Sequence, residues 1–421
     1  MKVAIATLGS RGDVQPFLAL ALALRRAGHT VCLATNKPFA ALADAYGVQM
    51  YPLAGDIKEI VGDAGRAELV AAGSSPLRAM RGLRRYVGPM VREALQRLPT
   101  ALEGCEAVIG QLLVPGAADL ARHHGLPYVE AAYVPIAPTR AFAHPGAPPW
   151  LGPGLVRRMS WFLAEQVFWQ AFRAEVNAFR REVLGLGEAP FLGVAPFSAT
   201  RRAPALMGYS TALVPRPADW PESMVVTGSW TLPAPADHQP PPRLLDFLAS
   251  GEPPVYVGFG SMDVDDPEAL TREVVRGLRL AGRRGVLSRG YGALAEVEGG
   301  DDLITIDDVP HAWLFPRMSA VVHHGGAGTT AAALHAGVPQ FIVPFLSDQP
   351  FWGHRVKTAG LGPTPVPVGQ LTAARLCAAI QHTQQPATRR RAEALGRVAR
   401  AEPGADGAAT AFDHILDRRS T

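Results

Sequence analysis

The first part of the chain alternates short apolar runs with stretches of helical spacing. Val3 to Leu8 is an apolar run that ends at Gly9, and apolar residues at helical spacing follow from Val14 to Ala27. Gly28 then precedes a second apolar run, Val31 to Thr35. This order predicts a strand, a helix and a second strand, which together form a βαβ unit.

The same alternation continues beyond this unit. Strand-like runs at Ala107 to Gln111 and Tyr128 to Tyr133 flank a helix-like stretch at Gly116 to His124, and such alternation implies a parallel sheet. Leu155 to Leu184 also has helical spacing and is rich in aromatic residues, but charged residues interrupt it too often for a membrane span.

A proline-rich segment separates this part from a second alternating region. Leu232 to Arg243 contains three consecutive prolines and cannot continue a helix or a central strand. Beyond it we expect strands at Val255–Gly260, Gly285–Ser288, Leu303–Asp307, Ala320–His323 and Gln340–Phe345, helices at Pro267–Ala281, Gly328–Ala336, Phe351–Thr358, Leu371–His382 and Thr388–Ala401, and a helical turn near Trp313.

These elements predict an α/β protein with two Rossmann-like, doubly wound domains that face each other across a cleft. The first domain is expected at residues 1–232 and binds the acceptor, a linker follows at 233–243, and the second domain at 244–402 binds a nucleotide. A C-terminal helix at 403–421 is expected to pack back toward the first domain.

Composition narrows the class of protein further. The chain has 421 residues, of which 48% are hydrophobic and 19% charged, as in globular proteins. A net charge of +4 is too small for a nucleic-acid coat, so no nucleic-acid partner is expected. The cysteines, Cys32, Cys105 and Cys377, lack the spacing of a zinc site or a disulfide framework. With no signal peptide in the sequence, a cytoplasmic location is expected.

The strongest chemical signal is a glycine-rich turn, HHGGAGTT at residues 323–330, between a strand and a helix. Glycines let a phosphate approach the backbone, and the amides at a helix start attract anions. The turn also fits the G-x-G-x-x-A pattern of dinucleotide-binding folds, with Asp348 about 20 residues on. The polar rings of His323 and His324 argue against that alternative, and Asp348 with Gln349 suits the hydroxyls of a hexose.

Each of these residues also has a simpler interpretation. Asp348 can be a helix cap, and His323 can be a satisfied core histidine, although beside the turn we favour a phosphate contact for His323. For His324 both interpretations remain open.

The second signal is GSRGD at residues 9–13, directly after the first strand. Its glycine spacing does not fit a dinucleotide fingerprint, but it places Arg11 and Asp13 at the ligand-facing edge of the sheet. Asp13 can deprotonate an acceptor hydroxyl as a general base, aided by a burial that raises its pKa. It can also cap a helix that begins at Val14, and the two roles can coexist.

Three weaker signals remain. Ser261, after the strand that ends at Gly260, can donate to a phosphate or simply form a turn. The acidic run at 263–266 is typical of metal motifs in some nucleotide-sugar enzymes, but Pro267 follows it, so we favour a helix start and no metal. Residues 66–97 carry seven arginines among apolar residues, and we favour a solvated helix face over contact with an anionic membrane, although weak peripheral contact stays possible.

Together these motifs resemble family 1 glycosyltransferases with the GT-B fold, in the branch of the sterol glucosyltransferases and bacterial antibiotic glycosyltransferases. The resemblance spans nearly the whole chain. Its segments are residues 9–17, 138–142, 219–221, 258–262, 309–315, 323–339 and 348–353.

The resemblance implies inverting transfer of a hexose from a nucleotide sugar to a hydroxyl, without a metal or a cofactor. The donor is expected to be UDP-glucose, with a dTDP-deoxysugar as the alternative. Carried over by position, Asp13 corresponds to the general base, Val309 to a nucleobase contact, and Asp348 and Gln349 to the sugar contacts. The rest of the expected donor site is Ser10, Arg11, Gly12, Ser261, His323, Gly325, Gly326, Ala327, Gly328 and Thr329.

The acceptor is less well indicated. Phe142-Ala143-His144-Pro145 stands where sterol enzymes usually carry Phe-Pro-His-Pro. A sterol, a terpenoid or a polyketide aglycone is expected, with an aromatic wall from Phe142, Trp161, Phe168 and Phe172, although core packing explains these rings as well. A nicotinamide-dependent oxidoreductase, a non-catalytic nucleotide-sugar or lipid-binding module, and an epimerase or phosphorylase are the alternatives from other classes.

Overall fold

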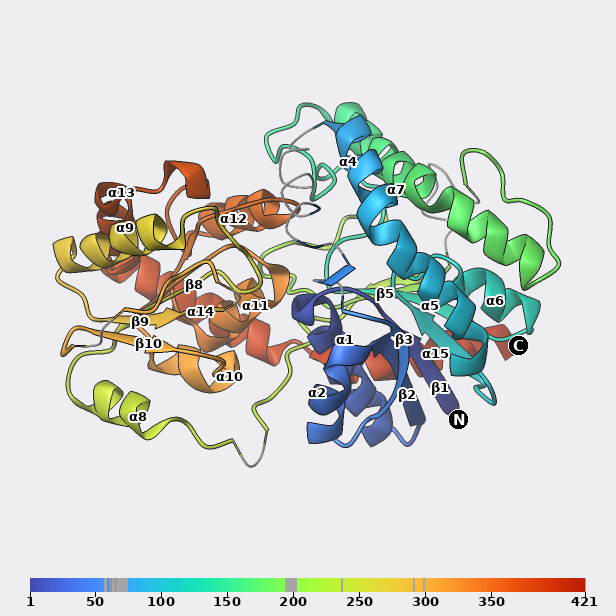
Figure 1. Ribbon diagram of the computed structural model, residues 1–421, viewed down its shortest axis with the longest axis horizontal. Coiled ribbons are helices and arrows are strands. Elements are labelled where there is room, and N and C mark those ends of the chain that lie inside the picture. Colours follow the sequence, from blue (N-terminus) through green and yellow to red (C-terminus); the bar gives the residue numbers. More distant parts are fainter. Residues whose placement is uncertain are drawn as a thin grey trace. The chain divides into compact units, whose positions relative to one another are not determined.

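A computed structural model of the chain describes residues 1–56, 59–60, 62, 65, 75–193, 203–235, 238–290, 292–297 and 300–420 (Figure 1). It divides into two compact α/β units. The first unit comprises Met1–Tyr209, Arg216–Trp230 and Pro403–Thr421, and the second comprises Ser210–Pro215 and Thr231–Glu402.

The first unit is built on a seven-stranded parallel sheet with the order β3-β2-β1-β4-β5-β6-β7. The direction of strand addition reverses between β1 and β4, and this switch point is where open α/β sheets bind ligands. The strands are β1 (Lys2–Ala6), β2 (Thr30–Asn36), β3 (Gln49–Ala54), β4 (Ala107–Gly110), β5 (Tyr128–Ala132), β6 (Ala205–Met207) and β7 (Met224–Val226).

Helices pack against this sheet, and the last helix of the chain belongs to the same unit. α15 (Gly404–Ser420) lies along α1 (Arg11–Arg26), where His29 Nε2 is 3.0 Å from Asp413 Oδ1. The other helices are α2 (Ala40–Ala45), α4 (Pro76–Gly82), a π-helical turn (Leu83–Val87), α5 (Gly88–Ala101), α6 (Ala117–His123) and α7 (Gly154–Glu182), with a short 3-10 turn at Lys37–Phe39.

The second unit repeats this plan with five parallel strands in the order β10-β9-β8-β11-β12, so its switch point lies between β8 and β11. The strands are β8 (Val255–Gly258), β9 (Gly285–Ser288), β10 (Leu303–Ile306), β11 (Ala320–His323) and β12 (Gln340–Ile342). The helices are α8 (Pro242–Ala249), α9 (Pro267–Leu280), α10 (His311–Leu314), α11 (Ala327–Ala336), α12 (Gln349–Thr358), α13 (Ala373–Thr383) and α14 (Pro386–Ala401).

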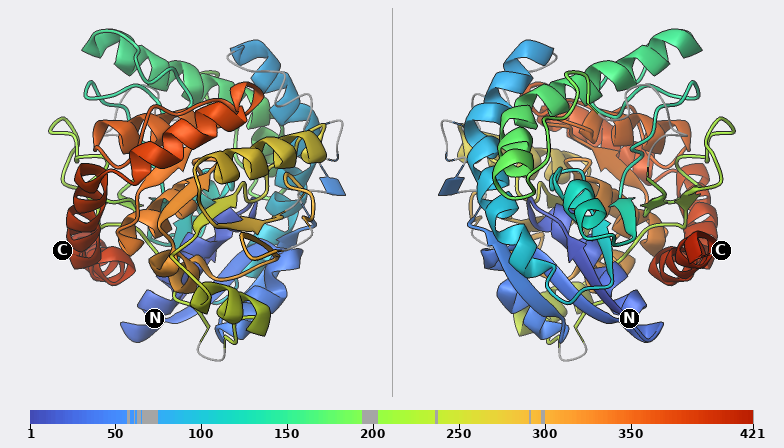
Figure 2. Two further views of the ribbon diagram at one scale, coloured as in Figure 1. Left: turned by 90° about the vertical axis from the view of Figure 1, so that its left-hand side faces the viewer. Right: turned by 90° about the vertical axis from the view of Figure 1, so that its right-hand side faces the viewer.

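Both faces of the second sheet are covered, as Figure 2 shows. Val255 and Val257 of β8 pack into a cluster with α9 and α13, whereas Tyr256 packs into another cluster with α8, α10 and α11. This burial on both faces explains why the strands read as continuous apolar runs in the sequence.

The α/β class is therefore confirmed, with differences in detail. α8 begins at Pro242, inside the expected linker, because proline is tolerated in the first turn of a helix. β12 ends at Ile342, before Pro344, since proline cannot donate to a ladder. β3 was not predicted as an element, whereas the helices from 76 to 101 fall largely within the basic stretch that we expected to be helical. Residues 66–74 of that stretch lie outside the described residues.

Candidate active site

The loop after β1 holds Asp13 by hydrogen bonds from Ser10. Oδ2 of Asp13 accepts from the Ser10 amide at 2.6 Å and from the Ser10 hydroxyl at 2.7 Å. Because α1 begins at Arg11, Ser10 occupies the N-cap position and Asp13 lies in the first turn. The alternative N-cap role of Asp13 is therefore wrong in position, since the helix starts three residues earlier than its apolar spacing indicates, and Asp13 is instead the third helical residue of a capping box with Ser10.

Gly9 makes this geometry possible. Its φ is +132°, and a Cβ atom there would lie 2.4 Å from Asp13 Oδ2. The Gly9 amide donates to Asn36 Oδ1 at 2.9 Å, which fixes the loop to the end of β2. A side chain at this position would displace the carboxylate of Asp13.

Two further side chains reach Asp13 from neighbouring strands. The hydroxyl of Tyr133 donates a very short hydrogen bond to Oδ1, and Gln111 contributes another side-chain hydrogen bond. Gln111 is itself held through Oε1, which accepts from Thr7 Oγ1 at 2.8 Å and from the Leu8 amide at 3.0 Å. Sequence reasoning missed Tyr133 and Gln111 as site residues, although each is the last residue of an expected strand and directly follows the strand that the structure shows.

These surroundings set the protonation of Asp13. Burial raises its pKa above the usual value, while the hydrogen bonds from Tyr133, Ser10 and Gln111 act in the opposite direction. The residue as a whole is half-buried. It can therefore meet a ligand, and a carboxylate with a raised pKa is a suitable proton acceptor for a hydroxyl.

At the glycine-rich turn of the second unit, His323 is fully buried. Nε2 is 3.0 Å from Gln340 Oε1, and Nδ1 accepts from the Gly325 amide at 3.1 Å. Burial lowers the pKa of His323 to about 3, so the ring is neutral and shapes the turn. With both nitrogens engaged inside the protein, His323 occupies the position of a satisfied core histidine instead of the phosphate contact favoured from the sequence.

His324 differs from its neighbour. Only 9% of it is exposed, and among the described residues its Nδ1 has no hydrogen-bond partner. The ring lies between two turns, because a Cβ atom on Gly260 would be 2.9 Å from Cε1 and one on Gly326 would be 2.4 Å from Nε2. Burial lowers the pKa of His324 to about 4. Among the described residues, the histidine nitrogen at this turn that lacks a hydrogen-bond partner is therefore the buried Nδ1 of His324.

The start of α11 supplies main-chain donors beside this ring. Gly326 is the N-cap, and the Thr330 amide returns to Gly326 O at 2.9 Å. The amides of Ala327, Gly328 and Thr329 precede that bond and have no acceptor within the helix. Gly328 is exposed, and a Cβ atom added to it would have no atom of the described chain within 4 Å. This helix start is thus suited to an anion.

Asp348 and Gln349 lie after β12, where Ser347 has a φ of +59°. Gln349 is 4% exposed, and its Oε1 accepts from the amides of Phe345 at 2.7 Å and Leu346 at 3.1 Å. Asp348 is the N-cap of α12, yet its Oδ2 accepts from Trp352 Nε1 at 2.8 Å instead of from a helix amide. Both side chains are therefore held in place by the loop and by α12.

The weaker signals are also located. Val309 is buried just before α10, and Ser261 is half-buried in the turn after β8. Asp266 caps α9 by accepting from the Ala269 amide at 2.8 Å, which confirms the helix-start interpretation of this acidic run. Among the described residues, no group of three or more histidine, cysteine or acidic side chains is arranged to hold a metal ion.

The expected aromatic wall is mostly core. Trp161 is 1% exposed, with Nε1 donating to Phe142 O at 3.1 Å, and Phe172 is fully buried. Phe168 packs edge-on against Phe172 and is only partly buried. Trp161 and Phe172 therefore stabilise the first unit, whereas Phe142, at 8% exposure, and Phe168 lie nearer its surface.

Comparison with known proteins identifies the family. The model of the glycosyltransferase family 28 N-terminal domain matches residues 3–110, and that of the erythromycin biosynthesis protein CIII-like C-terminal domain matches residues 294–412. A sterol 3-beta-glucosyltransferase of Arabidopsis thaliana is 36% identical over 99% of this chain and 68% of that protein. A sterol 3-beta-glucosyltransferase of Cryptococcus neoformans is 34% identical over 99% of this chain but only 27% of that longer protein.

Solved structures support the fold. The glycosyltransferase of kitacinnamycin superposes with a TM-score of 0.70 at 21% identity over 99% of both chains. The glycosyltransferase VinC in complex with DTDP gives a TM-score of 0.68 at 19% identity over 99% of this chain and 100% of that one. The chain is therefore a glycosyltransferase and belongs to family 1 with the GT-B fold, in the branch of the sterol glucosyltransferases and bacterial antibiotic glycosyltransferases.

Proposed function

We propose that this enzyme transfers glucose from UDP-glucose to a hydroxyl of a lipophilic acceptor such as a sterol, with inversion and without a metal ion. Several relatives that match 98–99% of this chain are named sterol 3-beta-glucosyltransferases, and this supports both the sugar and the acceptor class. A dTDP-sugar is the alternative donor, because a structural neighbour was solved with DTDP.

Asp13 acts as the general base. It lies at the switch point of the first sheet, where Ser10 and Tyr133 hold its carboxylate and the residue as a whole is half-buried. The acceptor hydroxyl gives its proton to Asp13 as its oxygen attacks the anomeric carbon from the face opposite the departing diphosphate. This carboxylate, held in place at the switch point of the sheet, is the observation that carries the proposal.

The diphosphate leaves toward the start of α11. Negative charge grows on it as the glycosidic bond breaks, and the amides of Ala327 to Thr329 with the positive end of the helix dipole stabilise that charge. The Nδ1 atom of His324 adds a hydrogen bond when it carries the proton. His323 positions this turn through the Gly325 amide and does not itself touch the phosphate.

Asp348 and Gln349 bind hydroxyls of the sugar. The loop orients them through Trp352 and the amides before α12, so their geometry is fixed before the donor arrives. Ser261 donates to a phosphate oxygen, and the main chain at Val309 contacts the base.

A product screen by mass spectrometry tests this proposal. The enzyme is incubated with UDP-glucose, dTDP-glucose or NADH and with a panel of sterols, other hydrophobic alcohols and water-soluble phenols. We expect a hexose mass added to a hydrophobic alcohol with UDP-glucose as donor. Transfer only from dTDP-glucose would show that the proposed donor is wrong, and transfer only to polar phenols would show that the proposed acceptor class is wrong. Binding of a nucleotide with no product from any pair of donor and acceptor would contradict the proposal.

A further inference from the structure

The outward face of α7 carries a row of exposed apolar side chains. Leu155 is 68%, Met159 50% and Leu163 51% exposed, and their spacing of four residues places them on one face of the helix. Trp161 and Phe172, which are buried, lie on the opposite face. Single exposed apolar residues are common, but an aligned row is typical of an interface.

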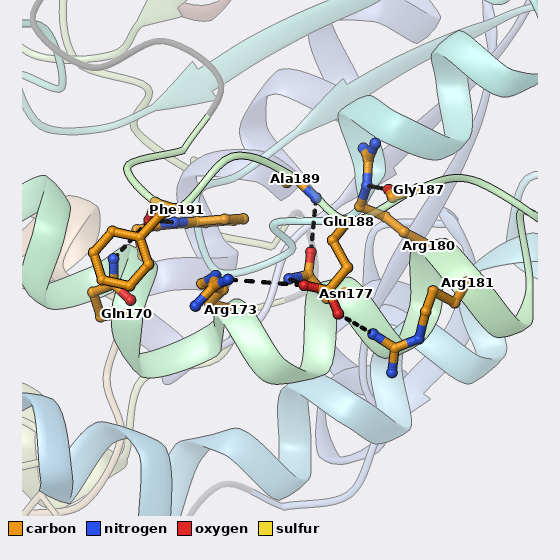
Figure 3. A network of polar contacts seen from close by, with 10 residues as sticks. Gln170, Arg173, Asn177, Arg180, Arg181, Gly187, Glu188, Ala189 and Phe191 are labelled. Atoms are coloured by element: carbon orange, nitrogen blue, oxygen red, sulfur yellow. Dashed lines mark hydrogen bonds and ion pairs between the residues drawn. The ribbon is translucent and has the colours of Figure 1, made fainter.

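The chain that follows α7 folds back and lengthens this row (Figure 3). Gln166 donates to Leu192 O at 3.0 Å, and Gln170 donates to Phe191 O at 2.8 Å. By helical spacing these glutamines share the face of Leu155 and Met159. Phe191 and Leu192 are 64% and 44% exposed, so the row continues along the helix. We name Leu155, Met159, Leu163, Phe191 and Leu192 the α7 ridge.

A basic groove lies beside the same helix. α4 and α5 pack along α7, and a groove of about 490 Å³ between them is lined by arginines from the 81–92 stretch and by Ala174 and Glu175 of α7. Arg92 faces Glu175, with 3.5 Å between Nη2 and Oε1. Arg81 and Arg84 are exposed and form no ion pair within the described part of the chain. The groove therefore keeps positive charge available for an external anion.

The groove borders the far end of the ridge. The guanidinium of Arg173 lies 4.9 Å over the ring of Phe191, and the next residue, Ala174, lines the groove. The apolar row and the arginine groove thus lie at neighbouring positions of α7. A bilayer with anionic lipids complements that combination, because acyl chains take the apolar residues and lipid phosphates take the arginines.

We propose that the α7 ridge and the arginine groove form a docking surface for an anionic phospholipid bilayer. The surface gives the enzyme access to acceptors dissolved in the membrane, and this purpose rests on the proposed lipophilic acceptor. The interaction is peripheral, since no described helix is both long and apolar enough to cross a membrane. Phosphate contacts by Arg81 and Arg84 supply the dependence on lipid charge, and the ridge supplies charge-independent affinity.

Co-sedimentation of the full chain with lipid vesicles tests this inference without donor or acceptor, so its outcome is independent of the proposed reaction. Vesicles of phosphatidylcholine are compared with vesicles of an equal mixture of phosphatidylcholine and phosphatidylglycerol. We expect binding mainly to the mixed vesicles. R81Q with R84Q should lower that binding about 25-fold, since each surface arginine contributes about a factor of five. M159S with L163S should lower it about tenfold or more.

The matched control is R389Q with R390Q, which removes two exposed arginines from α14 of the second unit. This variant should bind vesicles like the unmodified protein, and circular dichroism should show that all three variants are folded. Equal binding by the groove variant and the control would overturn the inference, as would no sedimentation of the unmodified protein with mixed vesicles. Binding to inorganic phosphate but not to vesicles would overturn it too, since it would mark an ion site only.

Discussion

The hydrogen bond from Tyr133 to Asp13 provides a quantitative test of the general base. Tyr133→Phe removes one donor to the carboxylate and keeps the ring, which packs edge-on against Phe17. A hydrogen bond to a charged group is worth about 1.5–3 kcal/mol. Because about 1.4 kcal/mol corresponds to one pKa unit, removing it should raise the pKa of Asp13 by about one to two units.

The assay is the pH dependence of kcat for transfer, measured for the unmodified enzyme and for Tyr133→Phe. Burial already raises the pKa of Asp13, so the acidic limb should lie above the ordinary range of an aspartate. In the variant the limb should move to higher pH by about one unit or more, while the plateau changes little. Ser10→Ala, which removes the donor 2.7 Å from Oδ2, should shift it in the same direction. A limb that stays in place in both variants would refute the assignment of Asp13.

Three further predictions concern stability and the anion site. The pKa of His323 and of His324 is lowered by burial from 6.5 to about 3 and about 4, so the stability they contribute is present above pH 6.5 and is lost as pH falls toward those values. Near pH 5 the free energy of unfolding, measured with urea, should be lower by about 2 kcal/mol per ring than above pH 6.5. A free energy of unfolding that does not change with pH over this range would contradict the prediction. Gly9→Ala should abolish transfer and lower the melting temperature in calorimetry, because its Cβ would lie 2.4 Å from Asp13 Oδ2; an active, stable variant would contradict this geometry. In calorimetric titration with UDP, Gly326→Ala should weaken binding because its Cβ would lie 2.4 Å from His324 Nε2, and an unchanged affinity would count against the role of His324.

Much of the fold follows from local patterns. The expected strands Gly285–Ser288 and Ala320–His323 coincide with β9 and β11, because buried parallel strands read as short apolar runs between turns. β3 escaped prediction because it includes Pro52 and is only partly buried along most of its length. Its place at the edge of the sheet explains why proline is tolerated there.

The site was harder to predict because its contacts join distant parts of the chain. Tyr133 and Gln111 meet Asp13 only because β4 lies beside β1 in the sheet and β5 follows β4, an order that local spacing does not give. The two adjacent histidines are a different case. Strand alternation places His323 on the same buried face as Val321, so its core position follows from β11 itself. Its partner Gln340 comes from the neighbouring strand β12.

The most direct test of the central claim is the turnover of Asp13→Asn, with the affinity for UDP measured on the same sample. Asparagine keeps the size of the side chain but cannot accept the proton of an acceptor hydroxyl. General-base catalysis contributes about 10²–10⁴-fold, so turnover should fall by that factor while the affinity for UDP is unchanged. Near-normal turnover in Asp13→Asn would show that another group takes the proton and would contradict the mechanism.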